Sequence, residues 1–505
     1  MSMSIEPQTI CYASLGVFLV WYIMKWQRDP LHNIPTVGGP SLPIFSYITA
    51  FRFNSNGKAL FEEGYKRYYN SVFKVALLDQ WLVCLTGSKL LDELRKRGES
   101  ELSFYKGIED VMQTRFTMGP EIMDDPYHND IIRDKLTHML PVIVPEAIDE
   151  LSIALPEYIP TGTADEWVEV SICRPMLEIV ARLSNRSFVG APLCREKEYL
   201  DIAIDFAIDI NSDRLLLGFL PDFVKRFMGK FTSSAKRSVR RTLPYFKDVL
   251  AERRRLMKEN GDDWPDKPND TIQWILDYAV PRGYDDFSVV MRILFVNFGA
   301  IHTTGNSLTH ALYDLASMPE YIQPLREEID LIVATEGWTK NALAKMWKLD
   351  SFVKESQRIN GVVLTTMIRK AVKDVVLVNG TLIPKGTMVI GPQLPTHLNE
   401  EYFPDAQTFD PFRFSRMREK EGEGMKHQFV QTSTEFVAFG HGKRACPGRF
   451  FAANEMKAIM AYIIFHYDLK IPGDGSRPKN LYHGLTHVLP DPNGKVLFRR
   501  RKRES

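Results

Sequence analysis

A ten-residue stretch at positions 439–448, FGHGKRACPG, combines one cysteine with three glycines and two cations. Apolar residues recur at three- and four-residue spacing directly after it, which predicts a helix buried along one face. Cys446 then lies at the N-terminus of that helix, where Pro447 suits the first turn and the free N–H groups favour an anion. The cysteine is therefore a candidate thiolate. Because Gly440, Gly442 and Gly448 leave the backbone bare, we expect a large flat ligand to press against this loop.

The order of residues in this loop matches a known signature. Phe-x-x-Gly-x-Arg-x-Cys-x-Gly, formed by Phe439, Gly442, Arg444, Cys446 and Gly448, resembles the haem-binding motif of the cytochrome P450 family. The resemblance implies that Cys446 is the axial thiolate ligand of the iron in haem b, and that the other four residues bind the cofactor. A buried structural cysteine is the alternative, and it leaves the glycines of the loop unexplained.

The longest uninterrupted helical pattern covers residues 286–317, with Asp286 or Ser288 as its cap and Pro319 just beyond its end. Gly299 lies in the middle of this helix, where glycine costs about 1 kcal/mol relative to alanine. Its position therefore needs a reason, such as room for a ligand beside the helix. Thr303, one turn later, can direct its hydroxyl either to that ligand or back to a carbonyl group.

The segment NFGAIHTT at 297–304 resembles the oxygen-activation segment of the same family, in which an acid precedes two threonines. The resemblance implies that Thr303 orients oxygen and water, with His302 and Thr304 beside it in the catalytic set. His302 stands where an acid is usual. An imidazole can relay protons, since its unperturbed pKa is about 6.5. It can equally serve a structural or substrate-shaping role, and the sequence leaves both open.

Glu355 and Arg358 are three residues apart in a helical stretch, so both charges lie on one helix face. Arg413 follows in the irregular, proline-containing segment FDPFRF. Together they resemble the family's buried triad, which supports the loop before the cysteine. A buried ion network of this kind costs several kcal/mol when one member is removed.

Further cations are candidates for binding the carboxylates of the haem. The resemblance places Arg369, on an expected strand, and Arg444 with His441, in the cysteine loop, near these propionates. Arg133 lies in an expected helix at 128–139 that often presents a tryptophan and an arginine in the family, although no tryptophan is present here. An ordinary solvent-facing arginine is the alternative for Arg133, and surface charge is the alternative for Arg369.

Composition limits the class of protein. The 505 residues are 44% hydrophobic and 25% charged, with a net charge of +1, and no basic patch interleaved with aromatic residues stands out. Nucleic-acid binding is therefore disfavoured. The five cysteines are scattered without metal-ligand spacing, which favours a reducing compartment over a disulfide framework.

The apolar run from Ile10 to Met24 is short for a membrane span, so a cleavable signal peptide is an alternative. Trp21 and Trp26 suit a membrane interface, and positive charge follows the run, which favours a retained signal anchor with the body on the cytosolic side. We expect a luminal N-terminus (1–9), a transmembrane anchor (10–26), a proline-rich hinge (27–50) and a haem–thiolate catalytic domain (51–505) in the endoplasmic reticulum membrane.

Secondary-structure patterns predict a mainly α fold with small β-sheets, and the resemblance implies the cytochrome P450 fold. Valine- and leucine-rich residues at 72–85 predict a short sheet, and helical patterns dominate from there to Met346. Short strands are expected at 362–378 and 381–390 around an Asn379-Gly380 turn, with a further hairpin at 482–489.

The resemblance implies a monooxygenase that inserts one oxygen atom from O2 into a lipophilic small molecule. No dinucleotide fingerprint or P-loop is present, so the electrons should come from a separate NADPH–cytochrome P450 reductase, with Lys443, Arg449 and Arg133 or Lys135 as candidate docking cations. The His-Thr-Thr variant resembles fungal members that act on terpenoids and other secondary metabolites. The alternatives are a haem–thiolate isomerase or dehydratase that needs no reductase, and a non-enzymatic haem-based ligand sensor. Candidate cavity-lining segments are 102–116, 206–227, 297–302, 362–367 and 484–488.

Overall fold

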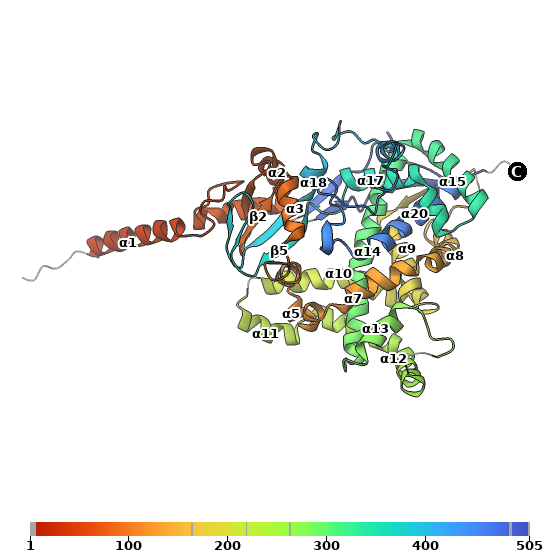
Figure 1. Ribbon diagram of the computed structural model, residues 1–505, viewed down its shortest axis with the longest axis horizontal. Coiled ribbons are helices and arrows are strands. Elements are labelled where there is room, and N and C mark those ends of the chain that lie inside the picture. The colour runs from red at the N-terminus through yellow and green to blue at the C-terminus, as the bar shows by residue number, and fades with distance from the viewer. Residues whose placement is uncertain (1–6, 163–164, 219, 262–263, 484–486, 503–505) are drawn as a thin grey trace, which may run out of the picture.

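The computed structural model describes residues 7–162, 165–218, 220–261, 264–483 and 487–502. The body is mainly helical with small sheets, which confirms the expected fold class (Figure 1). The helices are α1 (Pro7–Gln27), α2 (Pro43–Arg67), α3 (Ser88–Lys96), α4 (Phe104–Met112), α5 (Thr114–Thr117), α6 (Glu121–Asp124), α7 (Tyr127–Ile131), α8 (Leu140–Tyr158), α9 (Cys173–Phe188), α10 (Lys197–Gly218), α11 (Asp222–Phe231), α12 (Ser234–Asn260), α13 (Thr271–Ala279), α14 (Asp286–Ser317), α15 (Ile322–Glu336), α16 (Lys340–Lys345), α17 (Trp347–Ile359), α18 (Gln393–His397), α19 (Arg413–Arg418) and α20 (Arg449–His466). The strands are β1 (Val72–Ala76), β2 (Trp81–Leu85), β3 (Leu102–Ser103), β4 (Val168–Ser171), β5 (Thr365–Ala371), β6 (Val375–Val376), β7 (Leu382–Ile383), β8 (Met388–Pro392), β9 (Tyr467–Lys470), β10 (Asn480–His483), β11 (His487–Pro490) and β12 (Lys495–Arg500).

Helix α14 runs through the middle of the body and covers the range expected from the sequence (Figure 1). Its N-cap is Asp285, and the expectation of Asp286 or Ser288 was wrong. The backbone of Asp285 is extended, so its carboxylate turns back and accepts a hydrogen bond from the Ser288 N–H at 2.9 Å. The helix ends at Ser317, two residues before Pro319, whose ring cannot continue a helix.

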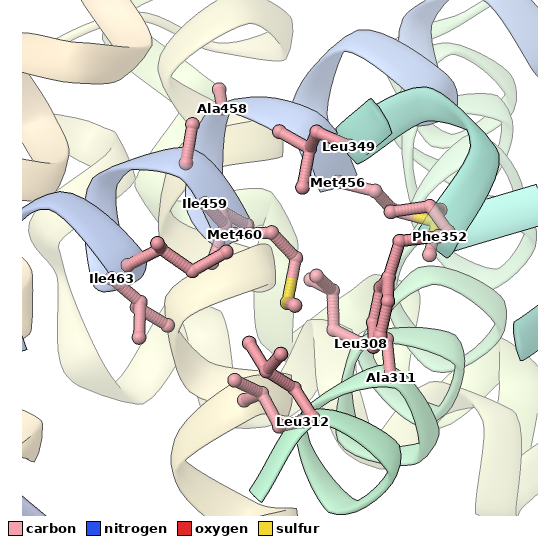
Figure 2. Packing of buried hydrophobic residues seen from close by; sticks show 14 of the residues in the cluster. Leu308, Ala311, Leu312, Leu349, Phe352, Met456, Ala458, Ile459, Met460 and Ile463 are labelled. Atoms are coloured by element: carbon pink, nitrogen blue, oxygen red, sulfur yellow. The ribbon is translucent and has the colours of Figure 1, made fainter. Parts of the chain in front are cut away.

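The C-terminal half of α14 packs against α17 and α20 in the main hydrophobic core (Figure 2). Each large apolar side chain buried there contributes about 1.5–3 kcal/mol relative to exposure. The helix that carries Gly299 and Thr303 and the helix that follows Cys446 are therefore fixed to each other by shared packing. The contacting residues include Leu308, Ala311 and Leu312 of α14, Leu349 and Phe352 of α17, and Met456, Ile459, Met460 and Ile463 of α20.

The largest sheet has the strand order β1-β2-β8-β5-β3. The pairing of β5 with β8 shifts by one residue between Thr366 and Arg369, where Met367 adopts a φ of +54°. Such a bulge changes which side of the sheet the following side chains face. The expected turn between β6 and β7 contains Gly380 at φ +83°. Two short strands, β3 and β4, interrupt the region that sequence patterns assigned mostly to helices.

The N-terminal helix α1 projects from the body (Figure 1). From Val17 to Met24 most of its large apolar side chains are exposed. The following proline-rich stretch is irregular only as far as residue 42, because α2 begins at Pro43 within the expected hinge. This stretch also packs on the body, since the Val37 N–H donates to the Lys74 carbonyl oxygen at 3.0 Å. Among the described residues searched, α14 is long and apolar enough to cross a membrane, but 56% of its most apolar window is buried, as expected for a core helix.

Candidate active site

The loop that carries Cys446 is held by its own backbone. The Cys446 N–H donates to the Phe439 carbonyl oxygen at 2.8 Å, and the Ala445 N–H donates to the Gly442 carbonyl oxygen at 3.0 Å. Gly442 has a φ of +76°, and a Cβ there would lie 2.8 Å from Cβ of Arg95. Glycine is therefore required at this position both by the backbone conformation and by the close approach of α3.

Helix α20 begins at Arg449 with Gly448 as its N-cap, so Pro447 precedes the helix and is not in its first turn as expected. Burial raises the pKa of the Cys446 thiol, whereas hydrogen bonds from the Gly448 and Arg449 N–H groups and the Arg449 charge lower it. The protein alone thus keeps the thiol protonated and aims donors at the sulfur. A metal cation at the sulfur reverses this balance, because a coordinating thiol is deprotonated.

On α14, two residues one turn apart are exposed although the helix lies in the core. Gly299 and Thr303 are exposed, while Asn297, Ile301 and Thr304 are buried. A Cβ at Gly299 would meet no atom within 4 Å. This strip therefore borders open space wide enough for a side chain, which fits a flat ligand beside the helix.

The Thr303 hydroxyl donates to the Gly299 carbonyl oxygen at 2.7 Å. Its proton is thus engaged within the helix, and its oxygen can accept a hydrogen bond from the open side. Thr304 is buried on another face of the helix, so the structure does not place it on the exposed strip. His302 contacts α10 instead, with its Nε2 2.7 Å from the Ile204 carbonyl oxygen.

Arg369 on β5 is 2% exposed and forms no ion pair with any described carboxylate; its Nη1 donates to the Ile368 carbonyl oxygen. Burial lowers the pKa of Arg369 to about 10. The charge of Glu99 raises this pKa, and the charge of Arg444 lowers it further. An arginine buried without an anionic partner is costly, so this site fits a ligand carboxylate. Arg444 lies nearby and is paired with Glu99 at 2.8 Å, while its guanidinium donates to the Tyr105 hydroxyl at 3.0 Å.

The structure gives the two remaining candidate haem-binding residues, Arg133 and His441, partners within the protein. Arg133 lies in a π-helical turn, Ile132–Leu136, within the expected helix, and it pairs with Asp130 at 2.9 Å with 39% of its side chain exposed. The structure gives it the partner expected of a surface arginine, although its charge lowers the pKa of Arg449 in the cysteine loop after the larger effect of burial. His441 is half-buried, and its Nδ1 lies 3.0 Å from the Thr432 hydroxyl.

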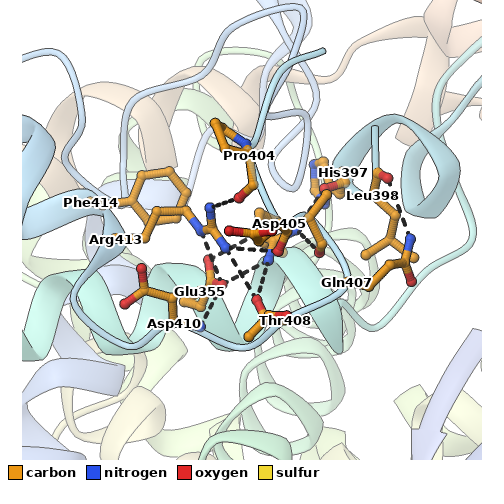
Figure 3. Close-up of polar contacts among 12 residues, drawn as sticks. Glu355, His397, Leu398, Pro404, Asp405, Gln407, Thr408, Asp410, Arg413 and Phe414 are labelled. Atoms are coloured by element: carbon orange, nitrogen blue, oxygen red, sulfur yellow. Dashed lines mark hydrogen bonds and ion pairs between the residues drawn. The ribbon is translucent and has the colours of Figure 1, made fainter. Parts of the chain in front are cut away.

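The structure brings Glu355 and Arg413 together (Figure 3), and Arg358 pairs with the same carboxylate. The Glu355 carboxylate accepts from Arg358 Nη2 and Nε at 2.7 and 2.8 Å and from Arg413 Nε at 3.2 Å. The two guanidinium groups also donate to carbonyl oxygens of the segment 397–408, which fixes its path. These acceptors are His397, Ala406 and Thr408 for Arg358, and Pro404, Asp405 and Thr408 for Arg413.

Sequence reasoning missed His397, which connects this network to the cysteine loop. Its carbonyl oxygen binds Arg358, and its Nε2 accepts a hydrogen bond from the Val437 N–H at 2.9 Å, two residues before Phe439. Its ring stacks on Phe436 at 5.0 Å. Burial lowers the pKa of His397 to about 3, so it is neutral and can accept. A lone histidine carries no sequence signal for such a role.

Comparisons with known proteins agree with this geometry. A family model described as cytochrome P450 matches residues 37–498. The chain is 44% identical to cytochrome P450 monooxygenase 151 of Postia placenta, over 98% of this chain and 99% of that protein. It is 42% identical to cytochrome P450 monooxygenase CYP512U6 of Ganoderma lucidum, over 98% and 97%. It is 30% identical to ent-kaurene oxidase P450-4 of Gibberella fujikuroi, over 97% of each chain.

Proposed function

The chain belongs to the cytochrome P450 family and is a cytochrome P450 monooxygenase, an oxidoreductase, and we propose that it hydroxylates or further oxidises a lipophilic small molecule with electrons from NADPH–cytochrome P450 reductase. The family implies a haem cofactor and a redox partner. The observation that carries the proposal is the exposed strip at Gly299 and Thr303 on a core helix, together with the backbone-ordered loop around Cys446.

The residues present fit haem b. Cys446 would supply the thiolate ligand, and the buried cation of Arg369 would meet a propionate, with Arg444 as a second candidate. Bound there, the haem would supply an iron centre whose thiolate ligand favours O–O bond cleavage. Phe439, Gly442 and Gly448 would shape the loop, since side chains larger than glycine at 442 collide with Arg95.

The protein's part in the reaction is positioning and proton supply. The Thr303 hydroxyl would accept a hydrogen bond from water on the open side while it donates its own proton to the Gly299 carbonyl oxygen. This leaves a hydrogen-bond acceptor at a defined place on the exposed strip of Gly299 and Thr303. Thr304, which is buried, would support the helix and not touch the reacting atoms.

The exposed apolar surface of α1 supports a membrane anchor. The positive charge that follows the apolar run supports a catalytic domain on the cytosolic side, which we assign to the endoplasmic reticulum membrane. NADPH would act only through the reductase. Of the candidate docking cations, Lys443 and Lys135 are exposed, whereas Arg133 and Arg449 are partly buried, so the two lysines are the better candidates.

A terpenoid is the substrate class that we propose. The name of the Gibberella relative says that it oxidises ent-kaurene, and the identity of 30% extends over almost the whole of both chains. The surroundings of the strip are apolar, which suits such a substrate: Phe206 and Ile210 of α10 and Ile301 of α14 are buried in one hydrophobic cluster, and Phe298 packs against it.

The first experiment is the ferrous–CO difference spectrum of purified protein, with Cys446→Ser as the control. We expect a thiolate-type band that Cys446→Ser abolishes; unchanged haem content and spectrum in the variant would refute the ligand assignment. The second is oxygen uptake with a lipophilic panel, reductase and NADPH. Turnover without NADPH or O2 would instead support a haem–thiolate isomerase or dehydratase, and no product under any supply would support a ligand sensor.

A further inference from the structure

Helix α10 is joined to α14 by two polar contacts in an otherwise apolar interface. At the first, Asn297 Nδ2 lies 3.4 Å from the Tyr199 hydroxyl, which itself donates to Asn185 Oδ1 of α9 at 2.7 Å. At the second, His302 Nε2 lies 2.7 Å from the Ile204 carbonyl oxygen. The two contacts are five residues apart on each helix, about 7.5 Å along the axis. They are therefore separate points of attachment.

The chemistry of the second contact fixes the protonation of His302. A carbonyl oxygen only accepts, so Nε2 must carry the proton that it donates. Burial is the main cause that lowers the pKa of His302 below its ordinary value, and Arg174 on α9 acts in the same direction. The Ile204 carbonyl and Asp205 on α10 raise the pKa of His302, but its net value stays below the ordinary one. His302 is thus a neutral imidazole at neutral pH, with its lone pair on Nδ1.

This arrangement is unsuited to proton relay. A relay residue takes up a proton on one nitrogen and releases one from the other. Here Nε2 is held on a backbone carbonyl, which is not a base, and a proton on Nδ1 would require the imidazolium ion that burial disfavours. A tether needs only the hydrogen bond that is present.

We propose that His302 is a positioning residue whose neutral ring holds α10 against the turn of α14 that carries Gly299 and Thr303. The inference rests on the proposed function, because it concerns the cavity between these helices. Its consequence is specific to this chain. An acid at position 302 would direct a carboxylate toward the Ile204 carbonyl oxygen with no proton to donate, so the tether would be lost and the two oxygens would repel each other. Restoring the acid usual in the family should therefore impair this protein.

The test compares His302→Gln, His302→Leu, His302→Asp and Tyr199→Phe in the haem-loaded, full-length protein. Glutamine retains a donor at similar reach, whereas leucine has none. Amide hydrogen exchange of residues 198–208 is the first readout, and it does not depend on turnover. We expect exchange near the wild-type rate in His302→Gln and about fivefold faster exchange in His302→Leu, the effect of one lost hydrogen bond. His302→Asp should be at least as fast as His302→Leu.

The second readout is the pH profile of reductase-supported NADPH oxidation between pH 6 and 8. If His302 is a tether, His302→Gln keeps the wild-type profile, and Tyr199→Phe speeds exchange in α10 as His302→Leu does. If it is a proton relay, His302→Gln alters the profile while Tyr199→Phe does not, and His302→Leu leaves exchange in α10 at the wild-type rate. That second pattern would overturn the proposal. Loss of the thiolate-type CO band in wild-type protein would instead refute the proposed function, and the exchange result would stand independently.

Discussion

Glu355 and Arg358 form an ion pair from which water is fully excluded, with Arg358 Nη2 2.7 Å from Glu355 Oε1. Both side chains have no exposed surface, and Arg413 approaches the same carboxylate oxygen at 3.2 Å. A pair of this kind is weak evidence for net stability, because desolvation offsets much of the attraction. Its effect here is geometric, since the guanidinium groups bind the carbonyl oxygens of the segment that leads to the cysteine loop.

Removing the Glu355 carboxylate should therefore destabilise the folded protein strongly. We expect Glu355→Ala to lose about 3–5 kcal/mol in free energy of unfolding, because two buried guanidinium groups lose their counter-ion. Folded, haem-loaded protein should not accumulate, which CO-difference spectra and thermal unfolding would reveal. Arg255→Ala on α12 is the matched control, since its pairs with Glu252 and Glu259 are about half exposed, and solvent screening should make their loss nearly neutral for stability. A Glu355→Ala protein with full haem content and only slower turnover would contradict the assignment.

Alanine substitutions at Gly442 and Gly380 form a second matched comparison, because both glycines have a positive φ. Gly442→Ala should lower both stability and haem retention, because φ is +76° and the added Cβ would lie 2.8 Å from Arg95. Gly380→Ala has a similar φ of +83° but meets no atom within 4 Å, so it should show only the strain of about 1–2 kcal/mol. Thermal unfolding and haem content of both variants separate collision from strain. Equal effects of the two substitutions would show that the approach of Arg95 is unimportant.

Thr303→Ala tests the exposed strip. We expect near-normal haem content, with more of the NADPH electrons released as hydrogen peroxide, because water on the open side loses its acceptor. Thr309→Ala is the control, since the Thr309 hydroxyl makes the same contact four residues back, to the Gly305 carbonyl oxygen at 2.8 Å, but is buried. That variant should lose stability and keep its peroxide yield. A peroxide yield that rises equally in both would mean that the helix contact, and not the open side, is responsible.

Glu455 on α20 should make stability depend on pH. It is buried, and its described partner is the Ser184 hydroxyl at 2.8 Å, so burial raises its pKa to about 8 from an ordinary 4.5. The folded protein then holds a proton that the unfolded chain releases, and the free energy of unfolding should fall as pH rises from 4.5 to 8. The slope is at most about 1.4 kcal/mol per pH unit.

Denaturant unfolding of wild type and Glu455→Gln between pH 6.5 and 8 measures this effect. The amide cannot titrate, so its profile should be flatter than that of the wild type over this range. Below pH 6.5 the opposite dependence enters, because burial lowers the pKa of His128, His310 and His397 to about 3 and the unfolded chain binds their protons more readily. Identical slopes above pH 6.5 would mean that Glu455 is ionised in the folded protein.

The sequence predicted the helical class, the limits of α14 and the residues of the Glu355 network, because these depend on periodicity and local spacing. It misassigned the cap of α14, since Asp285 and Asp286 are both good caps and only the backbone conformation distinguishes them. The role of His397 depends on a contact with Val437, forty residues away, and no local pattern encodes it.

His302 illustrates the same limit at the site itself. Sequence reasoning left relay and structural roles open, because both need only an imidazole at that position. The choice depends on which atom its Nε2 meets, and that atom belongs to a helix about one hundred residues earlier in the chain. Arg133 likewise required the structure, which pairs it with Asp130.

The bulge in β5 has a consequence for variation among related enzymes. Thr366 binds the Val437 carbonyl oxygen with its hydroxyl, whereas Arg369, beyond the extra residue at Met367, is buried as a cation. Because of the extra residue, the side chains before and after the bulge do not follow one continuous alternation between the two faces of the sheet. Residues upstream of the bulge can then be exchanged without rotating Arg369, so one end of the strand can vary while the other stays constant.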